Sequence, residues 1–160
     1  MLNGTLRFGE PLTVQVMFFR VMAAVIIGGL IGVDREIKNR PAGMRTHVLV
    51  CVGAVLVALI EMETISCVLK LNAAPAINLS AGRITSAVIS GVGFLGAGTI
   101  FIADRKISGL TTAASLWCTA CIGLAIGMGF IVMGVACGVI VLVVLRLMQR
   151  IVHVNTLKRL

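Results

Sequence analysis

Ile84-Thr-Ser-Ala-Val-Ile-Ser-Gly-Val-Gly-Phe-Leu-Gly-Ala-Gly-Thr-Ile-Phe-Ile-Ala103 is a run of 20 residues without a charge. That is about the length that a helix needs to cross a bilayer. Its four glycines place small residues on two opposite sides of such a helix, and small residues in lipid mark close helix contacts. We therefore predict that this stretch is the central helix of a membrane bundle. The packing glycines that we predict here and in the first span are Gly28, Gly32, Gly91, Gly93, Gly96 and Gly98.

The same run contains a dinucleotide-binding fingerprint, Gly91-x-Gly93-x-x-Gly96. That motif requires a strand before it and a helix that opens at it. In the middle of an apolar run, a strand–turn–helix would leave backbone groups unpaired in hydrocarbon. We therefore reject a nucleotide cofactor, and we expect no cofactor of any kind.

The composition predicts an all-α, polytopic membrane protein. The chain has 160 residues, of which 59% are hydrophobic and 12% charged, far from a soluble average. Residues 1–160 are expected to form a single transmembrane domain. A 39-residue uncharged run after Lys106 is too long for one crossing and is divided at Gly127-Met-Gly129. We predict a bundle of five spans over residues 14–33, 48–66, 84–103, 113–128 and 130–145.

The basic residues predict the orientation of these spans. The net charge is +8, but the Lys and Arg residues cluster at the ends of apolar segments, which indicates membrane topology rather than nucleic-acid binding. With five spans, ten basic residues lie on one side and three on the other. The positive-inside rule then places the N-terminus outside and the C-terminus in the cytoplasm. The expected location is a bacterial inner membrane, with the lipid bilayer as a partner and no nucleic acid.

Polar residues gather at the predicted cytoplasmic ends of the spans, in a region that we call the polar mouth. An anchor requires only bases, so the acids in this region indicate a binding site for an ion, an anion or a protein. The other interpretation is a positive-inside anchor with helix caps. An acid here could orient a neighbouring Arg or hold a cation. The polar mouth comprises Asp34, Arg35, Glu36, Arg45, Thr46, Asp104, Thr111 and Thr112.

Two further features lie within the spans. Arg20 and Glu61 fall at matching depths, about 10 Å from the outer face, so they are expected to form an intramembrane pair unless Arg20 extends to the interface. A second feature is a stripe of small polar side chains on the fourth span, which either joins helices or lines a solute path. Its members are Thr111, Thr112, Ser115, Cys118 and Thr119. Cys118-x-x-Cys121 lacks a second ligand pair, and packing is the preferred interpretation.

Four motifs resemble the MgtC/SapB family of bacterial inner-membrane proteins. Arg83 also stands where the family has an Arg before its glycine run. Asp34 replaces a more common Glu, and Ala87 replaces a usual Gln. The motifs are Gly28-Gly-Leu-Ile-Gly-Val-Asp-Arg-Glu36, Ala42-Gly-Met-Arg-Thr-His47, Gly91-Val-Gly-Phe-Leu-Gly-Ala-Gly98 and Gly109-Leu-Thr-Thr-Ala-Ala-Ser-Leu-Trp117.

The resemblance implies a role in magnesium homeostasis, in adaptation to magnesium limitation and, in some members, in virulence by restraint of the ATP synthase. The chain is similar to short members without a C-terminal ACT-like domain. Two functions stay open: a regulator that contacts a membrane complex such as the ATP synthase, and a transporter or channel for Mg²⁺ or another small ion. We also expect a homo-oligomer, for example a dimer. The metal ligands are unassigned. No enzyme is expected, since neither His47 nor His153 has an identifiable catalytic partner.

Overall fold

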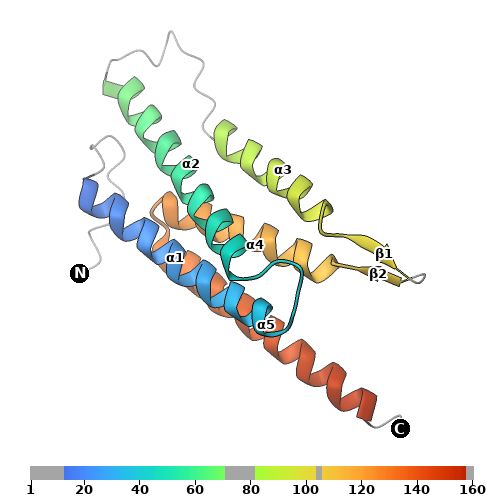
Figure 1. Ribbon diagram of the computed structural model, residues 1–160. Helices are drawn as coiled ribbons and strands as arrows, with labels where there is room; N and C mark the ends of the chain where they lie inside the picture. The colour runs from blue at the N-terminus through green and yellow to red at the C-terminus, as the bar shows by residue number, and fades with distance from the viewer. Residues whose placement is uncertain (1–12, 71–81, 104–105, 158–160) are drawn as a thin grey trace.

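The computed structural model describes residues 13–70, 82–103 and 106–157, which form five helices and one short hairpin (Figure 1). The order along the chain is α1 (Val14–Ile37), α2 (Met44–Lys70), α3 (Arg83–Ala97), β1 (Phe101–Ala103), β2 (Lys106–Ser108), α4 (Leu110–Gly127) and α5 (Ile131–Leu157). β1 and β2 pair antiparallel, with Ile102 opposite Ile107. The all-α prediction is therefore confirmed apart from this hairpin.

Successive helices run in alternating directions, so one end of the bundle collects the end of α1 and the starts of α2 and α4 (Figure 1). Within the described ranges, three helices are long and apolar enough to cross a membrane: α1, α2 and α4. α3 and the first part of α5, Ile131–Leu147, are apolar but shorter. Helices that are apolar over most of their surface are buried in a membrane or in a large core. A chain of 160 residues with three such helices of spanning length is a membrane protein.

The prediction of a third span over residues 84–103 is wrong at its C-terminal end. α3 ends at Ala97, and Phe101–Ala103 is a strand. The helix stops where the Thr99 backbone N–H and hydroxyl both bond to the Gly96 carbonyl, at 2.9 and 2.8 Å. The residues that follow are aromatic and β-branched, which favours an extended chain. An uncharged run of sufficient length therefore did not make one continuous helix.

The prediction that this helix is central is also wrong. α4 is the central element, because it packs against α1, α2, α3 and α5 (Figure 1). α3 packs mainly against two helices, α2 and α4. A Cβ added at Gly91 or Gly93 would meet nothing within 4 Å. Of the predicted packing glycines in α3, Gly96 lies against another helix, 3.4 Å from the Ala113 Cβ, while Gly98 contacts only its own helix.

The close helix contacts occur instead around α2. A Cβ added at Gly28 would lie 3.0 Å from the Cys51 Cβ, and one at Gly32 would overlap the backbone of Met44. These two predicted packing glycines therefore do lie at the α1–α2 contact. α4 approaches α2 in the same way at Gly123 and Gly127, where an added Cβ would collide with α2 backbone atoms. The glycines permit two helices to pack tightly on α2, as small residues do in lipid.

The boundary between the first two helices differs from the predicted spans over residues 14–33 and 48–66, which left residues 34–47 as a connecting loop. α1 continues to Ile37 and α2 begins at Met44. Asp34 and Arg35 are therefore part of the last turns of α1, and both are buried. A helical position fixes the directions of their side chains much more closely than a loop position would.

Candidate functional site

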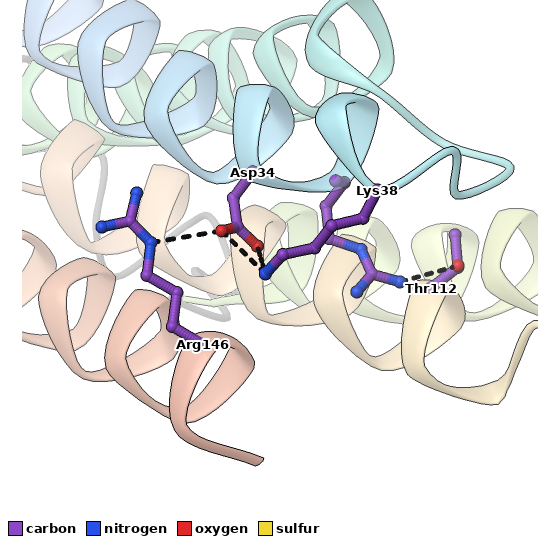
Figure 2. Close-up of polar contacts among 5 residues, drawn as sticks. Asp34, Lys38, Thr112 and Arg146 are labelled. Atoms are coloured by element: carbon purple, nitrogen blue, oxygen red, sulfur yellow. Dashed lines mark hydrogen bonds and ion pairs between the residues drawn. The ribbon is translucent and has the colours of Figure 1, made fainter. Parts of the chain in front are cut away.

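Asp34 is the centre of an ion-pair cluster at the end of α1 (Figure 2). The Lys38 ammonium, one turn further along, donates to both carboxylate oxygens at 2.9 and 2.7 Å. Arg146 reaches the same carboxylate from α5, where its Nε donates to Oδ1 at 3.2 Å. Asp34 is 5% exposed, whereas Arg146 is 69% exposed. The acid is thus held inside the bundle by two bases and joins α1 to α5.

Arg35 points toward α4 and is almost completely buried, at 1% exposure. Its Nη2 donates to the Thr112 hydroxyl oxygen at 3.1 Å, a bond drawn in Figure 2. Its Nε and Nη1 atoms are also buried and have no hydrogen-bond partner among the described residues. Arg35 and Thr112 are therefore brought together as members of the polar mouth, but the guanidinium is only partly satisfied.

A second buried polar group, His47, lies beside this contact at 0% exposure. Its Nδ1 is 2.9 Å from the Gly43 carbonyl, and its Nε2 is 3.1 Å from the Ser115 hydroxyl. A carbonyl can only accept, so Nδ1 carries a proton. In the neutral ring Nε2 is an acceptor, so the single Ser115 hydroxyl proton is donated either to Nε2 or to the Thr112 carbonyl 2.9 Å away. The ring therefore joins the start of α2 to α4, at a residue one turn beyond the Thr112 that binds Arg35.

The other residues of the polar mouth play separate roles. Glu36 is exposed, and its Oε2 accepts from the Met44 backbone N–H at 2.8 Å, which satisfies an otherwise unpaired donor at the start of α2. Arg45, Thr46 and Thr111 are exposed, and none of the three has a side-chain bond to another described residue of the polar mouth. Asp104 lies outside the described residues. The predicted site is thus only partly assembled.

The predicted pair of Arg20 and Glu61 is not formed. Arg20 is 5% exposed, and its Nη1 donates to the Gly127 carbonyl at 2.7 Å. Gly127 ends α4, where the negative end of the helix dipole attracts a cation. Glu61 instead accepts from the backbone N–H groups of Gly82 and Thr85, at 2.6 and 3.1 Å. Similar depths in the membrane did not bring the two side chains together, because Arg20 binds the end of α4 and Glu61 binds the start of α3.

The polar stripe of α4 is buried at Thr112, Ser115 and Thr119, while Thr111 is exposed and Cys118 is half-buried. Ser115 and Thr119 lie 2.9 and 2.8 Å from carbonyls one turn back, at Thr112 and Ser115. Such bonds satisfy hydroxyls within their own helix. With the contacts to Arg35 and His47, the stripe joins helices in this structure. Cys118 and Cys121 are free thiols.

The acids of the described residues are mostly engaged. Asp34 pairs with two bases, Glu36 binds the start of α2, and Glu61 binds the start of α3. Within residues 13–70, 82–103 and 106–157, no three His, Cys, Asp or Glu side chains come together as metal ligands would. A Mg²⁺ site would need carboxylate oxygens that are free to face the ion.

Sequence reasoning missed Lys38, Arg146, His47 and Ser115 as members of the site. Lys38 could have been found, because it follows Asp34 by four residues and α1 extends through both. His47 lies in a motif that was quoted, but its partner is 68 residues away. Arg146 is 112 residues from Asp34. Such distant pairs depend on the tertiary packing, for which the local sequence carries no signal.

The fold and the site define a membrane-embedded helical protein whose buried charges link the ends of its helices. The chain belongs to the MgtC family, whose model matches residues 21–154. It is 39% identical over 132 residues to the putative magnesium transporter YhiD of Escherichia coli, a match that covers 82% of this chain and 60% of the relative. It is 40% identical over 122 residues to protein MgtC of Salmonella typhimurium, covering 76% and 48%.

An uncharacterized protein of Haemophilus influenzae is 35% identical over 148 residues, which cover 90% of this chain and 61% of the relative. The chain therefore spans about half to three-fifths of the length of these curated relatives. No solved structure shows a significant match. The resemblance to the MgtC/SapB family, inferred from four motifs, is thus confirmed.

Proposed function

We propose that this chain is a regulator in the bacterial inner membrane, linked to magnesium homeostasis, that acts by helix–helix contact with a membrane complex. In this proposal the chain crosses the membrane five times, with the N-terminus outside and the C-terminus in the cytoplasm. Membership of the MgtC family supports the link to magnesium. The five described helices alternate in direction (Figure 1), which supports an odd number of crossings and termini on opposite sides.

The observation that carries the proposal is the outer face of α3. Ser86, Ser90, Gly93 and Ala97 lie on one side of this helix and are all exposed, and Gly93 has open space in front of it. Several other glycines of the bundle lie where another helix packs closely, as at Gly28 and Gly123. This side of α3 has the same small-residue character without a neighbour at Gly93 among the described residues, which suits a helix of a partner.

The engaged acids argue in the same direction. A cation pathway benefits from carboxylates along it, but Asp34 and Glu61 are already bound to cations and backbone donors. Releasing either group would leave buried charges or N–H groups unpaired, which is costly in a low-dielectric interior. The acids of the bundle are therefore better suited to stabilising the helix packing than to conducting Mg²⁺.

The proposed partner is a proton-driven complex such as the ATP synthase, as the family resemblance implies. A second copy of the chain is the other proposed partner, in a homo-oligomer such as a dimer. Both use helix packing in the membrane, and α3 offers a surface of the required kind. The protein needs no catalytic activity for this role.

The second candidate function is transport of Mg²⁺ or another small ion. A relative that is 39% identical is described as a putative magnesium transporter. Asp34 supplies a buried carboxylate at one end of the bundle, and an ion could reach it if Lys38 and Arg146 moved away. Transport would then require an exchange of partners at Asp34.

The proposal is tested by adding bulk to the open face of α3. Gly93→Leu should abolish the ability of the chain to support growth in low magnesium, while the purified variant melts near the wild-type temperature. Gly53→Leu on α2 is the matched control, because an added Cβ there also meets nothing within 4 Å. It should support growth and melt normally.

Copurification of the ATP synthase and cross-linking between copies would then identify which contact Gly93→Leu removes. If Gly93→Leu supports growth as well as Gly53→Leu does, the outer face of α3 makes no functional contact and the regulatory proposal fails. If both variants lose growth equally, bulk on any lipid-facing helix is harmful and the assignment to α3 is wrong.

A further inference from the structure

The start of α4 combines an uncapped helix N-terminus with a buried, partly unpaired cation. Gly109 is the N-cap residue, and the helix has no side-chain cap and no acid in its first turn. The Ala113 N–H bonds to the Gly109 carbonyl, but those of Leu110, Thr111 and Thr112 find no acceptor among the described residues. Such free N–H groups and the positive end of the helix dipole attract anions.

Arg35 is the second, independent feature of this place. Its Nη2 bonds to Thr112 in the first turn of α4, so the guanidinium lies against the same turn. Nε and Nη1 are buried without a described partner. A buried charge is strongly unfavourable unless it is paired and hydrogen-bonded, and here the helix dipole adds repulsion. The free N–H groups at the start of α4 and the buried Arg35 guanidinium would both be stabilised by an anion bound at the first turn of α4.

The described acids at this end of the bundle are committed elsewhere. Asp34, the neighbour of Arg35 in sequence, binds Lys38 and Arg146 (Figure 2). Glu36 binds the Met44 backbone N–H. Together, the bases Arg35, Lys38, Arg40, Arg45 and Arg146 exceed these two acids by three charges. The described part of the chain therefore leaves an excess of positive charge at this end of the bundle.

From this geometry we infer that the N-terminus of α4 and Arg35 bind a phosphoryl oxyanion. A tetrahedral oxyanion presents several acceptors at once, so it can accept from the helix N–H groups and from a guanidinium together. Arg35 is the charged anchor, Thr112 holds it in position, and the backbone of residues 110–112 supplies the remaining donors. The group can belong to free inorganic phosphate or to the headgroup of a phospholipid. This inference does not depend on the proposed function.

Gly109 is suited to such a site because it brings no side chain to the helix start. Its φ of 92° is left-handed, and an added Cβ would collide with the Thr99 carbonyl. The usual cap residues Ser, Thr, Asp and Asn occupy the first N–H groups with their own oxygens. A bare glycine leaves those donors available to a bound oxyanion.

The test uses the full chain, purified in detergent and dialysed against radiolabelled inorganic phosphate at constant chloride and ionic strength. The wild type should bind one phosphate per chain in a saturable manner. Arg35→Gln should weaken binding about tenfold or more, since the charge-assisted bonds are lost. Arg40→Gln, which removes an exposed base of the same end, should bind as the wild type does. Thr112→Val should also weaken binding, and it provides a test if Arg35→Gln fails to fold.

Native mass spectrometry of the same preparations distinguishes the two sources of the oxyanion. One phospholipid that is retained by the wild type and lost in Arg35→Gln, without binding of free phosphate, identifies a headgroup site. The inference is overturned if the wild type holds neither phosphate nor lipid. It is equally overturned if Arg35→Gln and Thr112→Val bind as tightly as the wild type.

Discussion

The starts of α3 and α4 show how differently two helices of one bundle can satisfy the same requirement. Both have a left-handed glycine as the N-cap, Gly82 with φ 88° and Gly109 with φ 92°. At α3, the buried Glu61 carboxylate accepts from the Gly82 and Thr85 N–H groups. At α4, no described carboxylate accepts from the first N–H groups, and the Arg35 cation donates to Thr112 in the first turn.

The difference separates a structural terminus from a candidate binding terminus. The dipole of α3 is complemented within the chain by an acid from α2, so this end is complete. The dipole of α4 is opposed rather than complemented by Arg35. A chain that can cap a helix with Glu61 has no physical need to leave another bare. In our inference the bare terminus of α4 is a binding site, whereas the terminus of α3 is stabilised by Glu61 from within the chain.

The largest effect should come from substituting the two N-cap glycines by alanine. Gly109→Ala should prevent the purification of monodisperse protein, because the new Cβ would overlap the Thr99 carbonyl. Gly82→Ala has room, with only the Thr85 hydroxyl at 3.9 Å, and should cost roughly 1–2 kcal/mol for the left-handed backbone. Size-exclusion chromatography and thermal melting in detergent measure both. Equal melting of the two variants would remove the distinction between these helix starts.

Glu61→Gln should produce the next largest effect. The amide retains one acceptor oxygen but turns an NH₂ group toward a backbone donor, and it loses the charge that complements α3. Hydrogen bonds to a charged group contribute about 1.5–3 kcal/mol, so the melting temperature should fall clearly. Glu63→Gln is the control, because Glu63 is exposed on the same helix. If both variants melt alike, Glu61 is not the cap that stabilises α3.

Asp34→Asn should have a smaller effect on stability than Glu61→Gln, but a greater effect on function. Two bases lose their partner, and one of them, Arg146, is mostly exposed, so solvent screening limits the loss to about 1 kcal/mol. We expect it to abolish support of growth in low magnesium with expression unchanged. Lys38→Ala should change melting least, since Arg146 still binds Asp34 in that variant and an i,i+4 pair contributes about 0.3–0.5 kcal/mol.

For the growth assay, Arg45→Ala is the informative comparison. Arg45 is exposed and makes no bond to Asp34. The variant Arg45→Ala should therefore retain more function than Asp34→Asn if the Asp34 cluster is the essential part of the polar mouth. If Asp34→Asn supports growth fully, the cluster is only an anchor and the functional assignment of Asp34 is wrong.

The sequence was sufficient for the membrane class, the family and the approximate positions of the helices. Hydropathy and charge placement determine these properties, and they are local in the sequence. The end of α3 was not predictable from charge alone, because Ile100 and Phe101 are as compatible with a membrane span as with a strand. The central position of α4 depends on Gly123 and Gly127 fitting against α2, which requires knowledge of the packing.

The polar mouth illustrates the same limit at the level of the site. Asp34, Arg35 and Thr112 were singled out from composition and motifs, and Arg35 and Thr112 do meet. Asp34 binds neither Arg35 nor Arg45, because the last turn of α1 directs it toward Lys38 and Arg146. A helix can place adjacent residues such as Asp34 and Arg35 on different sides, which the assumption of a loop concealed.

The most direct measurement is Mg²⁺ flux into proteoliposomes that contain the purified chain and a magnesium-sensitive dye. With Asp34, Glu36 and Glu61 engaged in structural bonds, the account predicts entry no faster than into empty liposomes. Asp34→Asn should leave that rate unchanged. Saturable Mg²⁺ entry through the wild type that Asp34→Asn reduces would contradict the account and establish the chain as a transporter.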